Sequence, residues 1–124
     1  MKIEASISLG ELYDKISILE IKKTHITSLT KLANINNECD QLNEIAINFP
    51  IEDDLYLRLK RVNEHLWSIE DDIRKKEKDH KFDDLFIHFA RSIYVTNDER
   101  SNIKNEINRM YGSEIIEEKS YEKY

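Results

Sequence analysis

The sequence contains few of the residues that β-rich, disulfide-bonded or membrane-spanning proteins need. Two glycines and one proline among 124 residues are too few turn formers for a β-sandwich or barrel. Cys39 is the only cysteine, which excludes an internal disulfide, and its helical register with Ile35 and Leu42 indicates a buried free thiol. No apolar run approaches the roughly 18 residues of a membrane-spanning helix. We therefore expect a globular chain with no membrane association.

The charge balance narrows the classes of partner. Asp and Glu number 25 against 19 Lys and Arg, which gives a net charge of −6 and argues against nucleic-acid or anionic-membrane binding. Residues 74–81 form a basic cluster, but Glu77 and Asp79 interrupt it. No glycine-rich phosphate loop and no zinc-ligand spacing occurs, so we predict no cofactor. An acid at position 4, where a signal peptide would be apolar, favours a cytoplasmic location.

Hydrophobic periodicity predicts an all-α fold in a single domain, residues 1–124. Three long helices are expected near 8–48, 53–79 and 83–111. A Ser-x-x-Glu capping box at Ser8 starts the first helix, Pro50 ends it, and Gly112 ends the third. Poor helix formers near residues 24–31 predict a bend that can divide the first helix into two.

Short links near 49–53 and 79–82 make the three helices antiparallel neighbours in a bundle. Alternating residues 2–7 predict a short N-terminal strand or extended arm, and residues 113–124 form an extended tail. In two antiparallel helices joined by a short link, residues that lie side by side have numbers that add up to the same sum all along the pair. A layer of polar and aromatic residues is therefore expected midway along the second and third helices: Glu64, Trp67, Glu70, Arg91, Tyr94 and Asn97.

This central layer has two interpretations. As a ligand-binding site, Trp67 and Tyr94 form walls while Glu70, Arg91 and Asn97 orient a small molecule, with Glu64 at the same level. As a structural network, Glu70 and Arg91 pair in the interior and determine the helix register. We favour the structural interpretation.

Carboxylates at helical spacing are weak candidates for metal ligands. Glu11 and Asp14 lie three residues apart on one helix face, and Asp71 belongs to an acidic run, so each could help to bind Mg²⁺ as in all-α nucleotide pyrophosphatases. However, each acid of 70–72 has a base four residues onward, which is typical of a solvated, salt-bridged surface. We therefore predict no metal.

The start of the first helix raises the question of oligomeric state. In a straight bundle, residues 8–23 extend beyond the other helices, yet they carry an apolar stripe of Leu9, Leu12, Ile16 and Leu19. Exposure of these four side chains would forgo about 6–12 kcal/mol of hydrophobic stabilisation. Either the helix bends and returns this segment to the core, or a second chain covers it. We favour a symmetric homodimer.

Segments distributed over nearly the whole chain form a recognisable set: 7–12, 14–22, 31–34, 63–64, 66–67, 69–74, 90–92, 94, 96–98, 112–114 and 117–121. Together they resemble an uncharacterised family of small bacterial and phage proteins, a domain of unknown function. Tyr13 stands where that family has an aliphatic residue. Members often lie beside, or are fused to, surface-polysaccharide glycosyltransferase genes.

The resemblance transfers no catalytic residues, but it implies a link to glycan assembly and a glycosyltransferase as partner. Two function classes follow from the sequence. The favoured one is a non-enzymatic helical module for dimerisation and protein interaction. The alternative is a small enzyme or ligand-binding protein that uses the central layer or the carboxylates.

Overall fold

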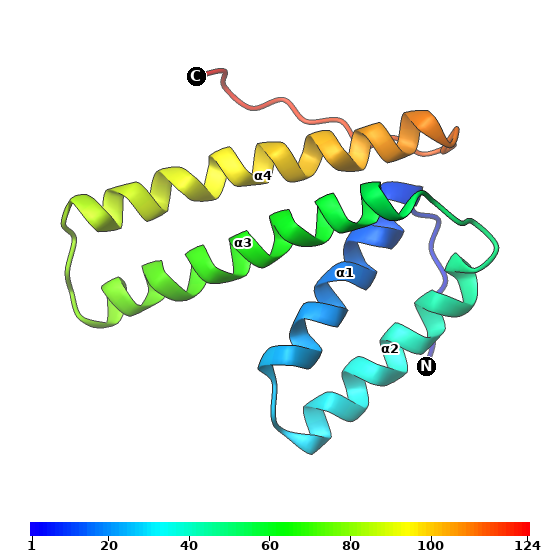
Figure 1. Cartoon of the computed structure of the whole chain (residues 1–124), viewed down its shortest axis with the longest axis horizontal. Helices are drawn as coiled ribbons and strands as arrows, with labels where there is room; N and C mark the ends of the chain where they lie inside the picture. The colour runs from blue at the N-terminus through cyan, green and yellow to red at the C-terminus, as the bar shows by residue number, and fades with distance from the viewer.

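The computed structural model describes residues 1–124 as an all-helical chain without β-strands (Figure 1). The helices are α1 (Leu9–His25), α2 (Leu29–Ala46), α3 (Asp53–Lys78) and α4 (Asp84–Met110). The predicted all-α class is therefore confirmed. For the N-terminus we expected a short strand or an extended arm; no strand forms, and residues 1–8 have no regular secondary structure.

The predicted bend in the first long helix is a complete break. Ile26 is extended, with φ −94° and ψ 129°, and its N–H makes the last hydrogen bond of α1, to the carbonyl of Lys22. Ser28 then begins α2 by accepting a hydrogen bond from the N–H of Lys31 on its side-chain oxygen. Ser and Thr next to the break have side chains that satisfy helix ends better than helix interiors, which explains the position of the interruption.

This break replaces the expected three-helix bundle by two helical hairpins. The chain reverses after His25, so α2 packs back along α1, and its backbone approaches neither α3 nor α4. From α3, Tyr56 packs against the side chains that α1 and α2 share. The second hairpin consists of α3 and α4, and α1 packs against both of its helices. Figure 1 shows α1 and α2 extending away from one end of this longer hairpin, whose other half projects freely.

Three groups of buried side chains form the core near the junction of the hairpins. Leu55 and Leu59 of α3 pack against Ile103 and Ile107 of α4. The remaining two groups join α1 to α2. One consists of Leu12, Ile16 and Ala46, and the other of Leu19, Ile35 and Cys39. Cys39 is a buried free thiol, as predicted. The buried group of the hairpin itself lies at the end nearest α1, and no residue of the hairpin between Ile69 and Thr96 is buried.

The C-terminal end of α4 has the glycine stop that the sequence predicts. Gly112 adopts a φ of +66°, and the N–H of Ser113 donates to the carbonyl of Asn108 at 2.8 Å, a pattern that ends many helices. The tail then runs back along the outside of α4 (Figure 1), where Tyr124 meets Tyr94 with 5.2 Å between ring centroids. The Tyr124 hydroxyl also donates to Asp98.

Candidate functional site

The first turn of α1 lies directly against α4. The N–H of Gly10 donates to Oδ1 of Asn108 at 2.7 Å, and a Cβ at position 10 would lie only 2.5 Å from the carbonyl oxygen of Lys104. Glycine is therefore required at position 10 for the two backbones to approach so closely. Ser8 accepts from the N–H of Glu11, and the N–H of Leu9 donates to Oγ of Ser113. The free N–H groups of this helix start are thus occupied by the chain itself.

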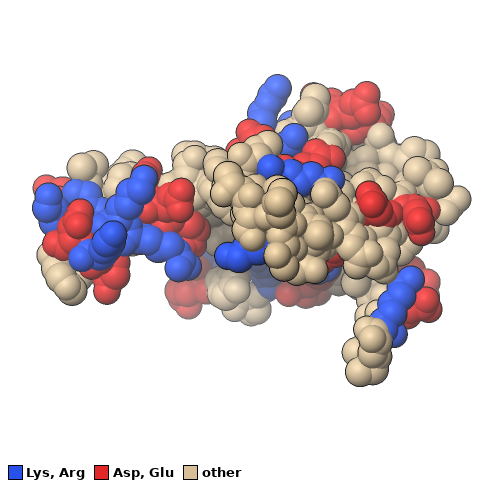
Figure 2. Space-filling view, turned by 90° about the horizontal axis from the view of Figure 1, so that it is seen from below, with Lys and Arg blue, Asp and Glu red and all other residues tan.

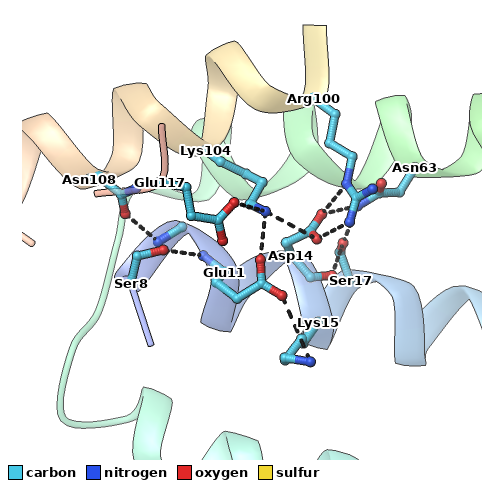
Figure 3. Close-up of polar contacts among 11 residues, drawn as sticks. Ser8, Glu11, Asp14, Lys15, Ser17, Asn63, Arg100, Lys104, Asn108 and Glu117 are labelled. Carbon is cyan, nitrogen blue, oxygen red and sulfur yellow. Dashed lines mark hydrogen bonds and ion pairs between the residues drawn. The ribbon is translucent and has the colours of Figure 1, made fainter. Parts of the chain in front are cut away.

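Asp14 is the centre of a buried polar network (Figure 3). The residue is 0 % exposed, and its carboxylate accepts hydrogen bonds from two nitrogens of Arg100, one of them at 2.9 Å. Nδ2 of Asn63 donates to the same carboxylate at 2.8 Å and to Oγ of Ser17 at 2.8 Å. The network thereby joins α1, α3 and α4 at one level.

The electrostatics of Asp14 favour its charged form. Burial alone would raise the pKa of this carboxyl, but the hydrogen bonds from Arg100 and Asn63 and the positive charges of Arg100 and Lys104 outweigh burial and hold the pKa below its usual range. Hydrogen bonding to Asp14 likewise raises the pKa of Arg100. The pair is therefore ionised at neutral pH.

Lys104 extends the network toward the C-terminal tail. Its Nζ lies 2.6 Å from Glu11, 3.4 Å from Glu117 and 3.9 Å from Asp14. Glu11 in turn lies 3.8 Å from Lys15. Burial alone would raise the pKa of Glu117, but the hydrogen bond and the positive charge of Lys104 outweigh burial and lower the pKa. Three acids and three bases thus neutralise one another across α1, α4 and the tail.

The carboxylates considered as metal ligands bind basic side chains. Glu11 and Asp14 contact Lys104 and Arg100, while Asp71 is exposed on α3. No group of three or more His, Cys, Asp or Glu side chains in the structure is arranged to bind a metal ion. The Glu-x-x-Asp spacing therefore marks the contact between α1 and α4, because residues three apart share a helix face.

The predicted central layer is not assembled as one cluster. Trp67 stacks on His25, with ring centroids 4.7 Å apart, and Glu70 accepts from Arg74 on its own helix at 3.2 Å. Arg91 is exposed and forms no ion pair, so the expected Glu70–Arg91 pair is wrong. Tyr94 contacts the tail instead.

The two remaining members of that layer, Glu64 and Asn97, make no side-chain hydrogen bond, and Glu64 is exposed. The reason for the error is geometric. Matching of residue numbers across a hairpin gives the height of a side chain along the axis but not its direction around the helix. Arg91 lies one turn from both Ile87 and Tyr94, which are exposed, so all three share the solvent-facing side of α4.

Arg100, Lys104 and Asn63 belong to the polar network around Asp14, and the sequence did not predict their role. One signal was available, since Arg100 interrupts the apolar seam of the third predicted helix, where a charged side chain needs a partner. Asp14, its partner, is 86 residues away in the sequence, and no periodicity links the two positions.

The apolar stripe considered as a dimer interface faces the interior of the chain. Leu12, Ile16 and Leu19 are 3–4 % exposed, and Leu9 packs against the core between α3 and α4. Because α1 folds onto the hairpin, this segment does not extend beyond it. The stripe therefore offers no surface to a second chain, and a homodimer would require another face.

The uncovered apolar surface lies on the distal hairpin, which we define as residues 68–95. No residue from 70 to 95 is buried. The larger apolar side chains exposed there are Phe82, Leu85, Ile87, Tyr94 and Val95. Lys, Arg, Asp and Glu side chains are intermixed over the same end, at the left of Figure 2.

A groove lies at the opposite end of the molecule. Residues 2–9, α2 and the turn after α4 enclose a groove of about 810 Å³ that opens to solvent. Its apolar lining includes Ile3, Leu42, Ile45 and Phe49. The charged network does not line this groove, apart from the backbone of the first turn of α1.

Comparison with protein families matches residues 1–124 to a family of unknown function, DUF6165. The chain belongs to this family. No significant match is found among curated proteins or among solved structures. None of the four helices has both the length and the apolar character that a membrane span requires.

Proposed function

We propose that this chain is a non-enzymatic helical module that dimerises and binds another protein. The observation that carries the proposal is the uncovered distal hairpin, where apolar side chains face solvent although the same two helices enclose a core at their other end. Several large apolar side chains exposed together, with charged residues around them, are typical of protein–protein contacts.

The buried network supports a structural role over a catalytic one. A catalytic acid, base or metal ligand has to reach a substrate, whereas Asp14 is fully buried and bonded to Arg100 and Asn63. Glu11 is likewise bonded to Lys104. These side chains hold α1 on the hairpin and thereby leave the distal half free as a rigid projection.

As the partner class we propose a surface-polysaccharide glycosyltransferase in the cytoplasm of a bacterium or of a phage-infected cell. This step is supported by the family resemblance of the sequence, in which such genes are neighbours, and it is an association rather than a geometric argument. The chain would then act as an assembly or positioning subunit in glycan synthesis and not as the transferase.

The test is a reconstitution from purified components. The chain and a surface-polysaccharide glycosyltransferase from the same host are mixed, and the molar mass of the complex is measured by light scattering after gel filtration. We expect a complex of defined stoichiometry. Failure to form a complex, combined with a rise in melting temperature on addition of Mg²⁺ or a nucleotide, would overturn the proposal and favour a small enzyme of the nucleotide-pyrophosphatase kind.

A further inference from the structure

The surface of α4 that faces α1 continues past the end of α1. Lys104 and Asn108 contact α1, and helical steps of three and four residues from them lead back through Ser101 and Asn97 to Tyr94, Ala90 and Ile87. The near half of this stripe is polar and occupied by α1. The distal half consists of Ile87, Ala90 and Tyr94, with Phe86 and Ile93 at one border and the exposed Arg91 at the other. No other helix of the chain lies against it (Figure 1).

Helix α3 contributes a matching continuation. Asn63 bonds to Asp14 of α1, and four residues later Trp67 stacks on His25 at the last residue of α1. Beyond Trp67, α3 makes no hydrogen bond, ion pair or ring contact with α1, because α1 diverges from the hairpin and turns into α2 (Figure 1). The same face of α3 goes on to Glu70 and Arg74, which pair with each other. The position that α1 takes beside the near half of the hairpin is thus taken by no helix beside the distal half.

We propose that a second copy of this chain fills this position, so that two distal hairpins pack antiparallel and form a four-helix bundle about a two-fold axis. The inference specifies the dimerisation part of the proposed function and rests on it. Paired helical hairpins are a common way to complete a bundle when one hairpin cannot enclose a core by itself.

The apolar area available agrees with a stable interface. Phe82, Ile87 and Tyr94 are 57 %, 53 % and 45 % exposed, and Trp67, Phe86, Ala90 and Ile93 are half-buried. Together these side chains expose on the order of 400 Å² of surface. A standard interface buries about 800 Å² on each partner, of which somewhat more than half is apolar. Tyr124 covers one edge of Tyr94, and the tail can remain there at the rim.

The charge at the turn between α3 and α4 is nearly balanced. Residues 74–84 carry five bases and four acids, and Lys76 pairs with Asp83 at 2.8 Å. The proposed contact between two copies therefore rests on the apolar stripe of α4.

The test places a charge in the stripe without removing any core atom. Ala90→Arg introduces a long cation at the centre of the proposed interface, and the matched control Ser92→Arg introduces the same cation two residues away on another face of α4. Sedimentation equilibrium should show a wild-type dimer, a dissociation constant raised at least about tenfold by Ala90→Arg, and little change for Ser92→Arg. Circular dichroism of dilute samples should show unchanged helix content in both variants.

A wild type that is monomeric at high micromolar concentration would overturn the inference. So would equal effects of Ala90→Arg and Ser92→Arg on the dissociation constant of the dimer. A chain that is monomeric but still forms a complex with the glycosyltransferase would refute this dimer and leave the protein-binding proposal intact. A dimer that responds to the substitutions as expected, but does not bind the glycosyltransferase, would support this dimer and refute the proposed partner.

Discussion

Removal of Arg100 is the most direct test of what holds α1 on the hairpin. Arg100→Ala deletes both hydrogen bonds from the guanidinium to Asp14 and leaves a carboxylate that is 0 % exposed. Loss of one partner from a buried ion pair costs about 3–5 kcal/mol. The lower end applies here, because the Arg100 side chain is 30 % exposed and Asp14 keeps its bond from Asn63. We therefore expect a loss of about 3 kcal/mol in the free energy of unfolding.

The measurement is thermal unfolding followed by circular dichroism, with Arg74→Ala as the control. A loss of this size lowers the melting temperature of a domain of this length by about 10 °C. Arg74 also pairs with one acid, Glu70, but that pair is exposed on a single helix, so Arg74→Ala should change the stability by less than about 0.5 kcal/mol. The difference between the two stability losses distinguishes the effect of a buried ion pair from that of an exposed ion pair in the same hairpin.

The pH dependence gives an independent signature. In the wild type the pKa of Asp14 lies below its ordinary value of 3.8, so this group contributes stability above that value and loses the contribution as the pH falls through the folded pKa. In Arg100→Ala, burial raises the pKa of Asp14 instead, and the folded variant gains stability as the pH falls through the raised value. The difference in the free energy of unfolding between the wild type and Arg100→Ala should therefore become smaller from pH 7 toward pH 4.

Asp14→Asn in the Arg100→Ala background should recover part of the loss, because an uncharged amide tolerates burial better than an unpaired carboxylate. Equal melting temperatures for Arg100→Ala and Arg74→Ala, or a gap that is constant over this pH range, would refute the network as the main link between α1 and the hairpin.

Three further outcomes are expected from single substitutions. Gly10→Ala should destabilise the chain by about 2 kcal/mol in thermal unfolding, although alanine is the better helix former, because the added Cβ would meet the backbone oxygen of Lys104 at 2.5 Å. Ser8→Ala removes the cap of α1 and should cost about 1 kcal/mol in urea unfolding. His25→Ala uncovers one face of Trp67, the only tryptophan, and should shift its fluorescence emission to longer wavelength without loss of helix content.

Local features of the fold could be predicted from the sequence because their causes are local. Apolar periodicity located the helices, and the Ser8 cap and the Gly112 stop defined their ends within a few residues. The break near residues 26–28 was visible as a run of side chains that prefer helix ends. The family resemblance and the absence of a helix suited to a membrane span were likewise properties of the sequence.

The tertiary structure decided which helix faces meet. The break returns α2 to α1, and this converts an expected three-helix bundle into two hairpins and places Leu12, Ile16 and Leu19 in the chain's own core. The partner of Asp14 is Arg100, 86 residues away, and the expected Glu70–Arg91 pair is lost because these side chains point in different directions around their helices. Sequence spacing specifies the face of a helix on which a residue lies, but only packing against other helices decides what covers that face. For the same reason, the uncovered half of the hairpin became visible only when α1 was placed beside the other half.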